Sequence, residues 1–199
     1  MKNKFQFLFR SFVHITFVSI LIFVIFFVSN NLNRFSNTEA QNNLSIYDLN
    51  EKGTLLDNTG NYTGAISYYD RALALNPMYI NALTNKGIAL YELGNYTGAI
   101  SYYDRALALN PYNTNVLDNK GIALDKIGNH SGAISYYDQA LEIDKYNTNV
   151  LDNKGIALYN LGNFTGAVSY FDQALALNPN DNNAVKFKNM TINNLRNHI

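Results

Sequence analysis

Gly94-Asn95-Tyr96-Thr97-Gly98-Ala99 is one of four nearly identical stretches that decide how this chain folds. The pattern Gly-Asn-x-Thr/Ser-Gly-Ala begins at Gly60, Gly94, Gly128 and Gly162, so that neighbouring copies are 34 residues apart. A fixed period of this size is typical of a solenoid, in which each unit buries its apolar face only against its neighbours. Such an array offers a long concave surface, which favours the binding of another macromolecule.

Each unit also shows the spacing of two helices. In residues 148–181, apolar residues recur at helical intervals up to Leu161, and Gly162 ends that first helix. A second apolar series follows and closes at Asn178-Pro179, because proline cannot continue a helical hydrogen-bond ladder. Glycine inside the first helix recurs in register at Gly53, Gly87, Gly121 and Gly155. Because an interior glycine costs about 1 kcal/mol relative to alanine, we expect close packing of the paired helices there.

These residues resemble the tetratricopeptide repeat family. The resemblance rests on Gly-x-Ala-Leu in the first helix, Gly at the turn, an aromatic residue two positions later, and then Ala, an aromatic residue, Ala and Pro. It implies an all-α fold, a right-handed α-solenoid of four helix pairs at residues 46–79, 80–113, 114–147 and 148–181. Residues 182–199 are predicted to form a capping helix, which makes nine helices in the array. Its expected apolar residues are Val185, Met190, Ile192 and Leu195.

Residues 1–30 predict a transmembrane signal anchor. Residues 12–28 form an almost unbroken apolar run whose length as a helix approaches the roughly 30 Å hydrocarbon core of a bilayer. This length favours an uncleaved anchor, and secretion after signal cleavage stays as the alternative. The basic residues before the run are Lys2, Lys4 and Arg10. They predict a short cytoplasmic N-terminal stub and repeats outside the cytoplasm, joined by an Asn-rich linker at residues 31–45.

By the family resemblance, the first helix of each repeat lines a concave groove. The candidate peptide-binding residues are Asn81, Asn85, Ile88, Asn115, Asp118, Asn119, Ile122, Asn149, Asp152, Asn153 and Ile156. The asparagines come in pairs four residues apart and therefore share a helical face. Asn85, Asn119 and Asn153 match the ladder with which some family members hold an extended chain, since amides both donate and accept hydrogen bonds. Duplication of one unit would also copy these asparagines without any ligand being involved.

Charge in the groove narrows the expected ligand. Asp118 and Asp152 favour a basic or polar partner, and the neighbouring isoleucines supply apolar contact. A second binding mode of the family, which clamps a carboxylate with basic groove residues, is disfavoured because Asn and Asp occupy its positions. The lysines directly after the ladder asparagines are expected to lie beside the groove in solvent; they are Lys86, Lys120 and Lys154.

Six Asn-x-Ser/Thr triplets are possible N-glycosylation sites if the domain lies outside the cell. They are Asn43, Asn61, Asn95, Asn129, Asn163 and Asn189. Four of the six belong to the repeated motif, and the chain holds 32 asparagines in 199 residues, which makes such triplets common by chance. The alternative is that these asparagines cap the second helix of each repeat.

The composition argues against several other functions. The chain has no cysteine, and its repeats carry 14 acidic and 8 basic residues, which disfavours nucleic acid as the partner. No metal-ligand spacing, phosphate loop or Ser/His/Asp set is present, and His130 lies in a turn, so neither catalysis nor a cofactor or small-molecule substrate is expected. The sequence therefore favours a membrane-anchored scaffold that binds a protein or peptide. The alternative is a glycan-bearing spacer or envelope component without a specific groove ligand.

Overall fold

The computed structural model describes residues 26–30 and 44–197, and the chain divides into two compact units, 1–45 and 46–199. In the first unit, the described residues 26–30 are helical. Most of the expected anchor at residues 12–28 and most of the expected linker at residues 31–45 lie outside the described residues. Within the part of the chain that is described, no helix is both long enough and apolar enough to cross a membrane.

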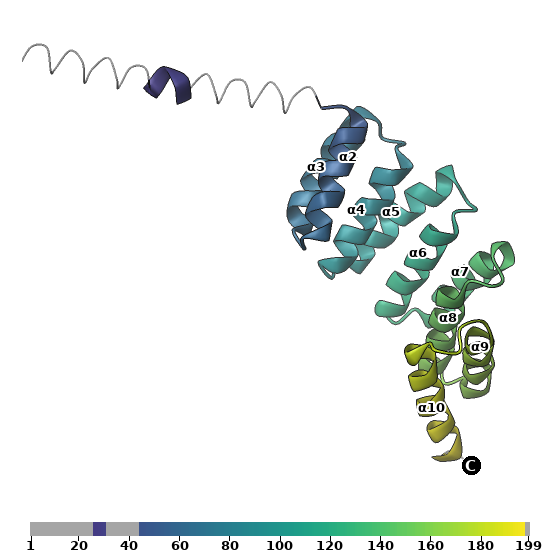
Figure 1. Cartoon of the computed structure of the whole chain (residues 1–199). Helices are drawn as coiled ribbons and strands as arrows, with labels where there is room; N and C mark the ends of the chain where they lie inside the picture. The colour runs from purple at the N-terminus through teal and green to yellow at the C-terminus, as the bar shows by residue number, and fades with distance from the viewer. Residues whose placement is uncertain (1–25, 31–43, 198–199) are drawn as a thin grey trace, which may run out of the picture. The chain divides into compact units, whose positions relative to one another are not determined.

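The second unit is entirely helical over its described residues, as the repeat pattern predicts (Figure 1). Four helix pairs and a final helix make nine helices in that part of the chain. They are α2 (Ile46–Asn58) and α3 (Tyr62–Leu75), α4 (Ile80–Glu92) and α5 (Tyr96–Leu109), α6 (Thr114–Lys126) and α7 (His130–Ile143), α8 (Thr148–Asn160) and α9 (Phe164–Leu177), and α10 (Asn182–Asn197).

The opening Gly-Asn of each motif forms the turn inside a repeat. Gly94 has a φ of +77°, a left-handed conformation that glycine adopts without the clash of a Cβ atom. The N–H of Asn95 bonds to the carbonyl of Leu90 at 2.9 Å, and the N–H of Gly94 bonds to that of Tyr91 at 2.8 Å. These two bonds form a Schellman motif, which satisfies the last carbonyls of α4.

The rest of the motif starts the second helix. The Oδ1 atom of Asn95 caps α5 by accepting a hydrogen bond from the N–H of Gly98 at 3.0 Å. A Cβ atom on Gly98 would lie 2.7 Å from Asn95 Nδ2, so glycine leaves room for the capping amide. The same cap is made by Asn61, Asn129 and Asn163. The motif is thus a turn and a helix cap combined.

The glycine inside each first helix allows an aromatic ring to pack against the backbone. A Cβ atom on Gly87 would lie 2.4 Å from Tyr103 Cε1, a distance that real contacts do not reach. Tyr103 is buried in α5, and small alanines flank it in the core. The equivalent pairs are Gly53 with Tyr69, Gly121 with Tyr137 and Gly155 with Phe171. The expected close approach of the paired helices is confirmed.

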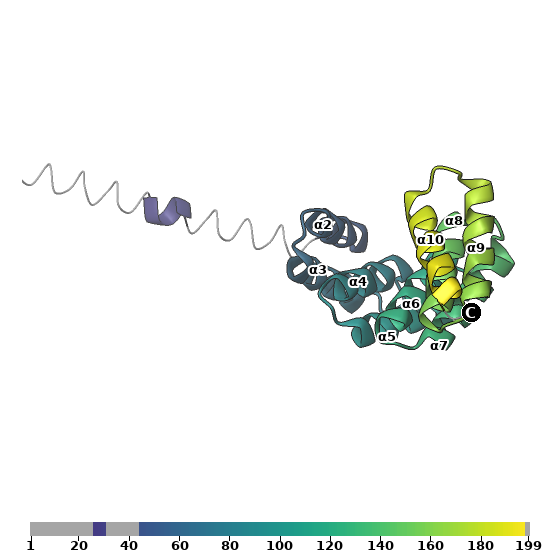
Figure 2. The ribbon, with the colours of Figure 1, turned by 90° about the horizontal axis from the view of Figure 1, so that it is seen from below.

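The helices form an inner and an outer layer. The first helices, α2, α4, α6, α8 and α10, contact one another in succession, and we call them the inner layer. The second helices, α3, α5, α7 and α9, form the outer layer, and among the described elements they contact only the inner helices beside them. The inner layer is therefore the more closely spaced one and lines the concave side of the arc seen in Figure 2.

The final helix occupies the place of a fifth first helix and covers α9, as a capping helix is expected to do. Its buried face agrees only in part with the predicted apolar residues. Ile192 and Leu195 are half-buried, whereas Val185 and Met190 are each 40% exposed. The fully buried residues of the helix are instead Ala184 and Thr191.

Candidate functional site

The predicted groove residues lie on three successive helices of the inner layer, α4, α6 and α8. Asn81, Asn115 and Asn149 are exposed near the starts of these helices, Asn85, Asn119 and Asn153 are half-buried one turn later, and Ile88, Ile122 and Ile156 are half-buried after them. Because the three helices contact in succession, equivalent residues follow one another along the concave side. The inner layer thus presents a repeated amide beside a repeated apolar residue.

The ladder asparagines also link adjacent repeats. Asn153 Nδ2 donates to Asp118 Oδ1 at 2.9 Å, and Asn85 Nδ2 donates to Asn50 Oδ1 at 3.2 Å. The side chain of Asn119, by contrast, makes no hydrogen bond to any described residue. A carboxamide carries two N–H donors and an acceptor oxygen. Each ladder residue therefore retains hydrogen-bonding atoms, and Asn119 retains all of them.

The acidic residues of the groove are poorly compensated. Burial raises the pKa of Asp118, and the hydrogen bond from Asn153 only partly opposes this effect. Asp152 is 8% exposed, and its Oδ1 atom has no hydrogen-bond partner among the described residues. Burial and the nearby carboxylate of Asp181 raise the pKa of Asp152 to about 7. Neither aspartate forms an ion pair with a described lysine or arginine.

His130 has a structural contact that its position in a turn did not suggest. Its Nδ1 atom lies 2.5 Å from Asp125 Oδ1, and Asn160 Nδ2 donates to the other oxygen of that carboxylate at 3.1 Å. In the second and fourth repeats an aromatic pair replaces this contact, namely Tyr91 with Tyr96 and Tyr159 with Phe164. In all three pairs the two residues are five positions apart, and this constant spacing is the feature of the sequence that indicates the contact. The pair joins the end of a first helix to the start of the second.

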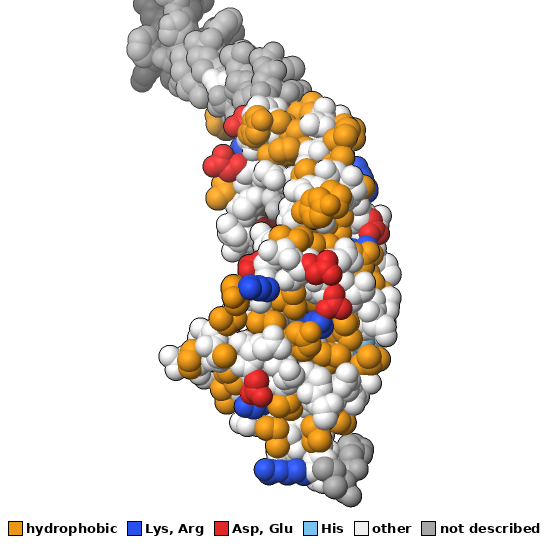
Figure 3. Space-filling view, turned by 90° about the vertical axis from the view of Figure 1, so that its right-hand side faces the viewer, with side chains coloured by type: hydrophobic (Ala, Val, Ile, Leu, Met, Phe, Trp, Pro, Cys, Tyr) orange, Lys and Arg blue, Asp and Glu red, His pale blue; other side chains and the backbone are white. Residues whose placement is uncertain are grey.

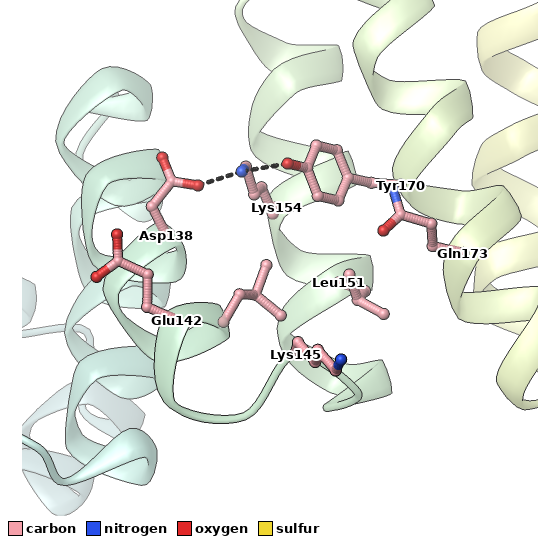
Figure 4. Close-up of a pocket in the computed structure, with 8 residues that line it drawn as sticks. Asp138, Glu142, Lys145, Leu151, Lys154, Tyr170 and Gln173 are labelled. Atoms are coloured by element: carbon pink, nitrogen blue, oxygen red, sulfur yellow. Dashed lines mark hydrogen bonds and ion pairs between the residues drawn. The ribbon is translucent and has the colours of Figure 1, made fainter.

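The three repeated lysines are not solvated, which corrects the expectation from the sequence. Lys154 is 6% exposed, and its Nζ atom lies between the carboxylate of Asp138 and the hydroxyl of Tyr170 (Figure 4). These three residues come from α7, α8 and α9 and line one side of a shallow pocket. The prediction failed because the lysine stem passes between two outer helices and reaches the aspartate of the preceding repeat.

This lysine arrangement recurs along the whole array. The ion pairs are Lys86 with Asp70, Lys120 with Asp104, Lys154 with Asp138, and Lys188 with Asp172, and the tyrosines beside the first three are Tyr102, Tyr136 and Tyr170. Burial lowers the pKa of the first three ammonium groups, but their hydrogen bonds to Asp and Tyr outweigh it and leave each pKa above its ordinary value. We call these contacts the lysine junctions.

The possible glycosylation sites divide into three groups. The four asparagines of the motif cap their helices through Oδ1, which confirms the capping interpretation without testing glycosylation. Asn189 is exposed on α10, whereas Thr191 of the same triplet is buried and donates to the carbonyl of Phe187. Asn43 lies outside the described residues.

The surface offers no single dominant patch on the face that Figure 3 shows. Apolar side chains are spread along the length of the array there, and acidic and basic side chains lie among them. Among the described residues, no group of three histidine, aspartate or glutamate side chains is placed to hold a metal ion. The repeated residues of the inner layer therefore remain the candidate site.

Several solved structures are similar to this chain. A structure of MamA is 25% identical over 70% of this chain and 75% of its own, with a TM-score of 0.65. A structure described as YrrB, a tetratricopeptide repeat protein with an unusual peptide-binding site, is 22% identical over 82% and 84%, with a TM-score of 0.67. The first repeat domain of Spaghetti (RPAP3), bound to the HSP90 peptide SRMEEVD, is 23% identical over 59% and 93%, with a TM-score of 0.57. These likenesses support the fold.

Family models agree with the repeat boundaries. A comparison with curated protein sequences finds no match. Three models described as tetratricopeptide repeat match residues 50–114, 114–147 and 148–181, which together span most of the chain and nearly all of the four predicted units. The chain therefore belongs to the tetratricopeptide repeat family.

Proposed function

We propose that this protein is an interaction scaffold that holds an extended peptide, or an extended segment of a partner protein, along its inner layer. The observation that carries the proposal is the recurrence of the same asparagine and isoleucine on three adjacent helices, with amide atoms left over after the contacts between repeats. Support by analogy comes from YrrB, which is described as having a peptide-binding site, and from RPAP3, which is bound to a peptide.

The proposed contacts are those of a peptide backbone. An extended segment presents N–H and C=O groups in alternation, and a carboxamide can pair with both. Ile88, Ile122 and Ile156 lie one turn beyond the ladder asparagines and would cover the apolar side chains of the segment. Backbone contacts supply affinity and the flanking residues supply selectivity, as in other modes of peptide recognition.

Asn119→Ala is the sharpest test of the groove, because Asn119 makes no side-chain hydrogen bond to any described residue. The full chain, solubilised in mild detergent, is used to capture partners from membranes of the source cells. Gln139→Ala is the matched control, since it removes an exposed amide from the outer helix α7. We expect the parent and the control to capture the same partner and Asn119→Ala to lose it.

A folded Asn119→Ala variant that captures the same proteins as its parent would contradict the groove function. Circular dichroism and a melting curve establish that the variant is folded. Retention of the partner would favour the spacer alternative, in which the ladder is a by-product of duplication. Mass spectrometry of the purified chain would then show whether the exposed turn asparagines carry glycans.

The second part of the proposal is the location of the scaffold, and it rests on the sequence alone. Residues 12–28 would anchor the chain, with the basic N-terminus in the cytoplasm and the repeats outside it. Protease added to intact cells should then remove the repeats, and alkaline extraction should leave the chain in the membrane fraction. Repeats that are protected in intact cells but cleaved after lysis would contradict this orientation. Secreted chain lacking its first residues would support the signal-peptide alternative.

A further inference from the structure

The charged residues are distributed unequally between the two layers. Three of the four lysine junctions place an ammonium group between an aspartate and a tyrosine of two successive outer helices, and Lys188 of α10 reaches Asp172 of α9 alone. Asp118 and Asp152 of the inner layer form no such ion pair with a described lysine or arginine. Asp118 accepts one hydrogen bond from a neutral amide, and the buried Oδ1 atom of Asp152 accepts none from the described residues. The concave side therefore holds carboxylates that lack a cation.

The register of the repeats explains why Asp152 lacks a donor. In the preceding junction, Asp118 receives its hydrogen bond from Asn153, a residue 35 positions later on the next inner helix. The residue 35 positions after Asp152 is Phe187 of α10. Its ring stacks on Phe171 of α9, with centroids 6.2 Å apart, and carries no donor. The aspartate has been repeated, but its amide partner has not.

The surroundings of Asp152 add a second carboxylate and no compensating charge. Asp181 accepts hydrogen bonds from the N–H groups of Asn183 and Ala184 at 2.9 and 3.1 Å, and so caps α10. Its carboxylate is close enough to Asp152 to raise the pKa of that group. The first basic residue of α10 is Lys186, five residues after Asp181. It is exposed and forms no ion pair with a described residue.

We infer that the segment bound in the groove is basic, and that one of its arginine or lysine side chains binds Asp152 where α8 meets the start of α10. A guanidinium or ammonium group would supply the donor that Phe187 lacks and neutralise two neighbouring carboxylates. The buried position of Asp152 makes this contact strong, because a charge-assisted hydrogen bond gains in a site with little water. The inference rests on the proposed groove function and specifies its ligand.

The test compares three short labelled peptides that differ only in charge. Each repeats Ser and Ala with a third residue, which is Arg, Gln or Glu, and binding to the full chain in detergent is followed by fluorescence anisotropy at low salt. We expect the arginine peptide to bind about tenfold or more tightly than the glutamine peptide, and the glutamate peptide to bind least. Added salt should reduce the preference for arginine.

Two variants locate the effect. Asp152→Asn removes the charge and keeps the shape of the side chain, and it should abolish most of the preference for the arginine peptide. Glu142→Gln is the matched control, since it removes one exposed negative charge from the outer helix α7, and it should change the preference by less than about twofold. Melting curves of both variants confirm that they are folded.

Each outcome bears on the inference. Equal affinity for the arginine and glutamine peptides, or an unchanged preference in Asp152→Asn, would overturn it. If both peptides still lose affinity in Asn119→Ala, the groove function stands and only the ligand charge is wrong. Binding of none of the peptides would overturn the inference and also count against the groove function. Binding of Ca²⁺ through Asp152 without binding of the arginine peptide would likewise overturn it.

Discussion

Lys86, Lys120 and Lys154 bury their ammonium groups beside an aspartate on the outer helix of the preceding repeat. On the inner layer, by contrast, Asp118 accepts a hydrogen bond from an amide only, and the buried Oδ1 atom of Asp152 accepts none from the described residues. Both layers derive from the same duplicated unit. The difference indicates a division of roles, in which the lysine junctions between inner and outer helices hold neighbouring repeats together and the concave side of the inner helices keeps polar atoms for a ligand. Substitutions on the two layers should therefore have different consequences.

The largest loss of stability is expected from a substitution at the contact between the two layers, because it disturbs the packing of both. Gly121→Leu places a side chain where a Cβ atom alone would lie 2.4 Å from Tyr137 Cε1. Overpacking of this kind typically costs 1–3 kcal/mol, and we expect about 3 kcal/mol here because the ring is fully enclosed. Thermal and denaturant unfolding measure the loss. An unchanged melting curve would mean that the glycine does not set the distance between the layers.

A lysine junction of the outer layer should contribute measurably to stability. Lys120→Met keeps the apolar stem but removes the ammonium group from Asp104 and Tyr136, and it should cost about 1–2 kcal/mol. Lys126→Met, which removes an exposed lysine at the end of α6, should cost less than about 0.5 kcal/mol. Because the folded-state pKa of Lys120 is raised, its contribution is complete below the ordinary pKa of 10.5 and is lost as the pH rises through the folded value. Equal costs for the two variants would show that the lysine junction adds nothing to the stability of the array.

Removal of a charge from Asp152 of the inner layer should increase the stability of the array, whereas removal of the charge from Lys120 should decrease it. The pKa of Asp152 is about 7 in the folded chain against an ordinary value of 3.8, so between these values the folded state holds a proton that the unfolded state lacks. Stability should fall as the pH rises from about 4 to 7 and then level off. Asp152→Asn should be more stable than its parent by about 1 kcal/mol near pH 8 and should differ little near pH 4. A destabilised variant near pH 8 would show that the carboxylate has a partner in solution.

The smallest expected effect on stability concerns the ladder asparagines. Asn153 forms a hydrogen bond to the neighbouring repeat, and the Asn119 side chain forms none to a described residue. Asn153→Ala removes the donor to the buried carboxylate of Asp118 and should cost about 0.5–1 kcal/mol. Asn119→Ala removes no hydrogen bond to a described residue and should cost less than about 0.5 kcal/mol. The melting temperatures of the two variants give the comparison. If Asn119→Ala were the more damaging change, its amide would be structural and the ligand test would lose its meaning.

Much of the fold follows from residues whose physical role is local. Gly94 adopts a left-handed conformation, Asn95 caps the next helix, and Gly87 admits the ring of Tyr103, and each of these effects depends only on nearby sequence. Copying them at a constant period therefore predicts the helix pairs and their order. The family resemblance predicts the site residues on the inner helices, and they lie there on α4, α6 and α8, while their role in binding stays a prediction.

The remaining errors arose where a side chain reaches another repeat. The position of Lys86 directly after the ladder residue Asn85 predicts a solvated side chain, but its ammonium group lies beside Asp70 of the previous repeat. The separation of 16 residues between such aspartates and lysines is constant and was visible in the sequence. The lack of a hydrogen-bond partner for Asp152 Oδ1 was harder to predict from the sequence, because it depends on Phe187 packing against α9.

The position of Asn189 has a consequence for how such a gene can lengthen. Asn189 stands in α10 where the earlier first helices carry the glycine that admits an aromatic ring, so α10 lacks the surface on which a second helix packs. A unit inserted at an internal boundary would recreate the Asp–Lys contact on both of its sides. A second helix packed on α10 in the same way would meet the side chain of Asn189 where the earlier first helices admit an aromatic ring. Recombination at an internal boundary therefore lengthens the array without this obstacle.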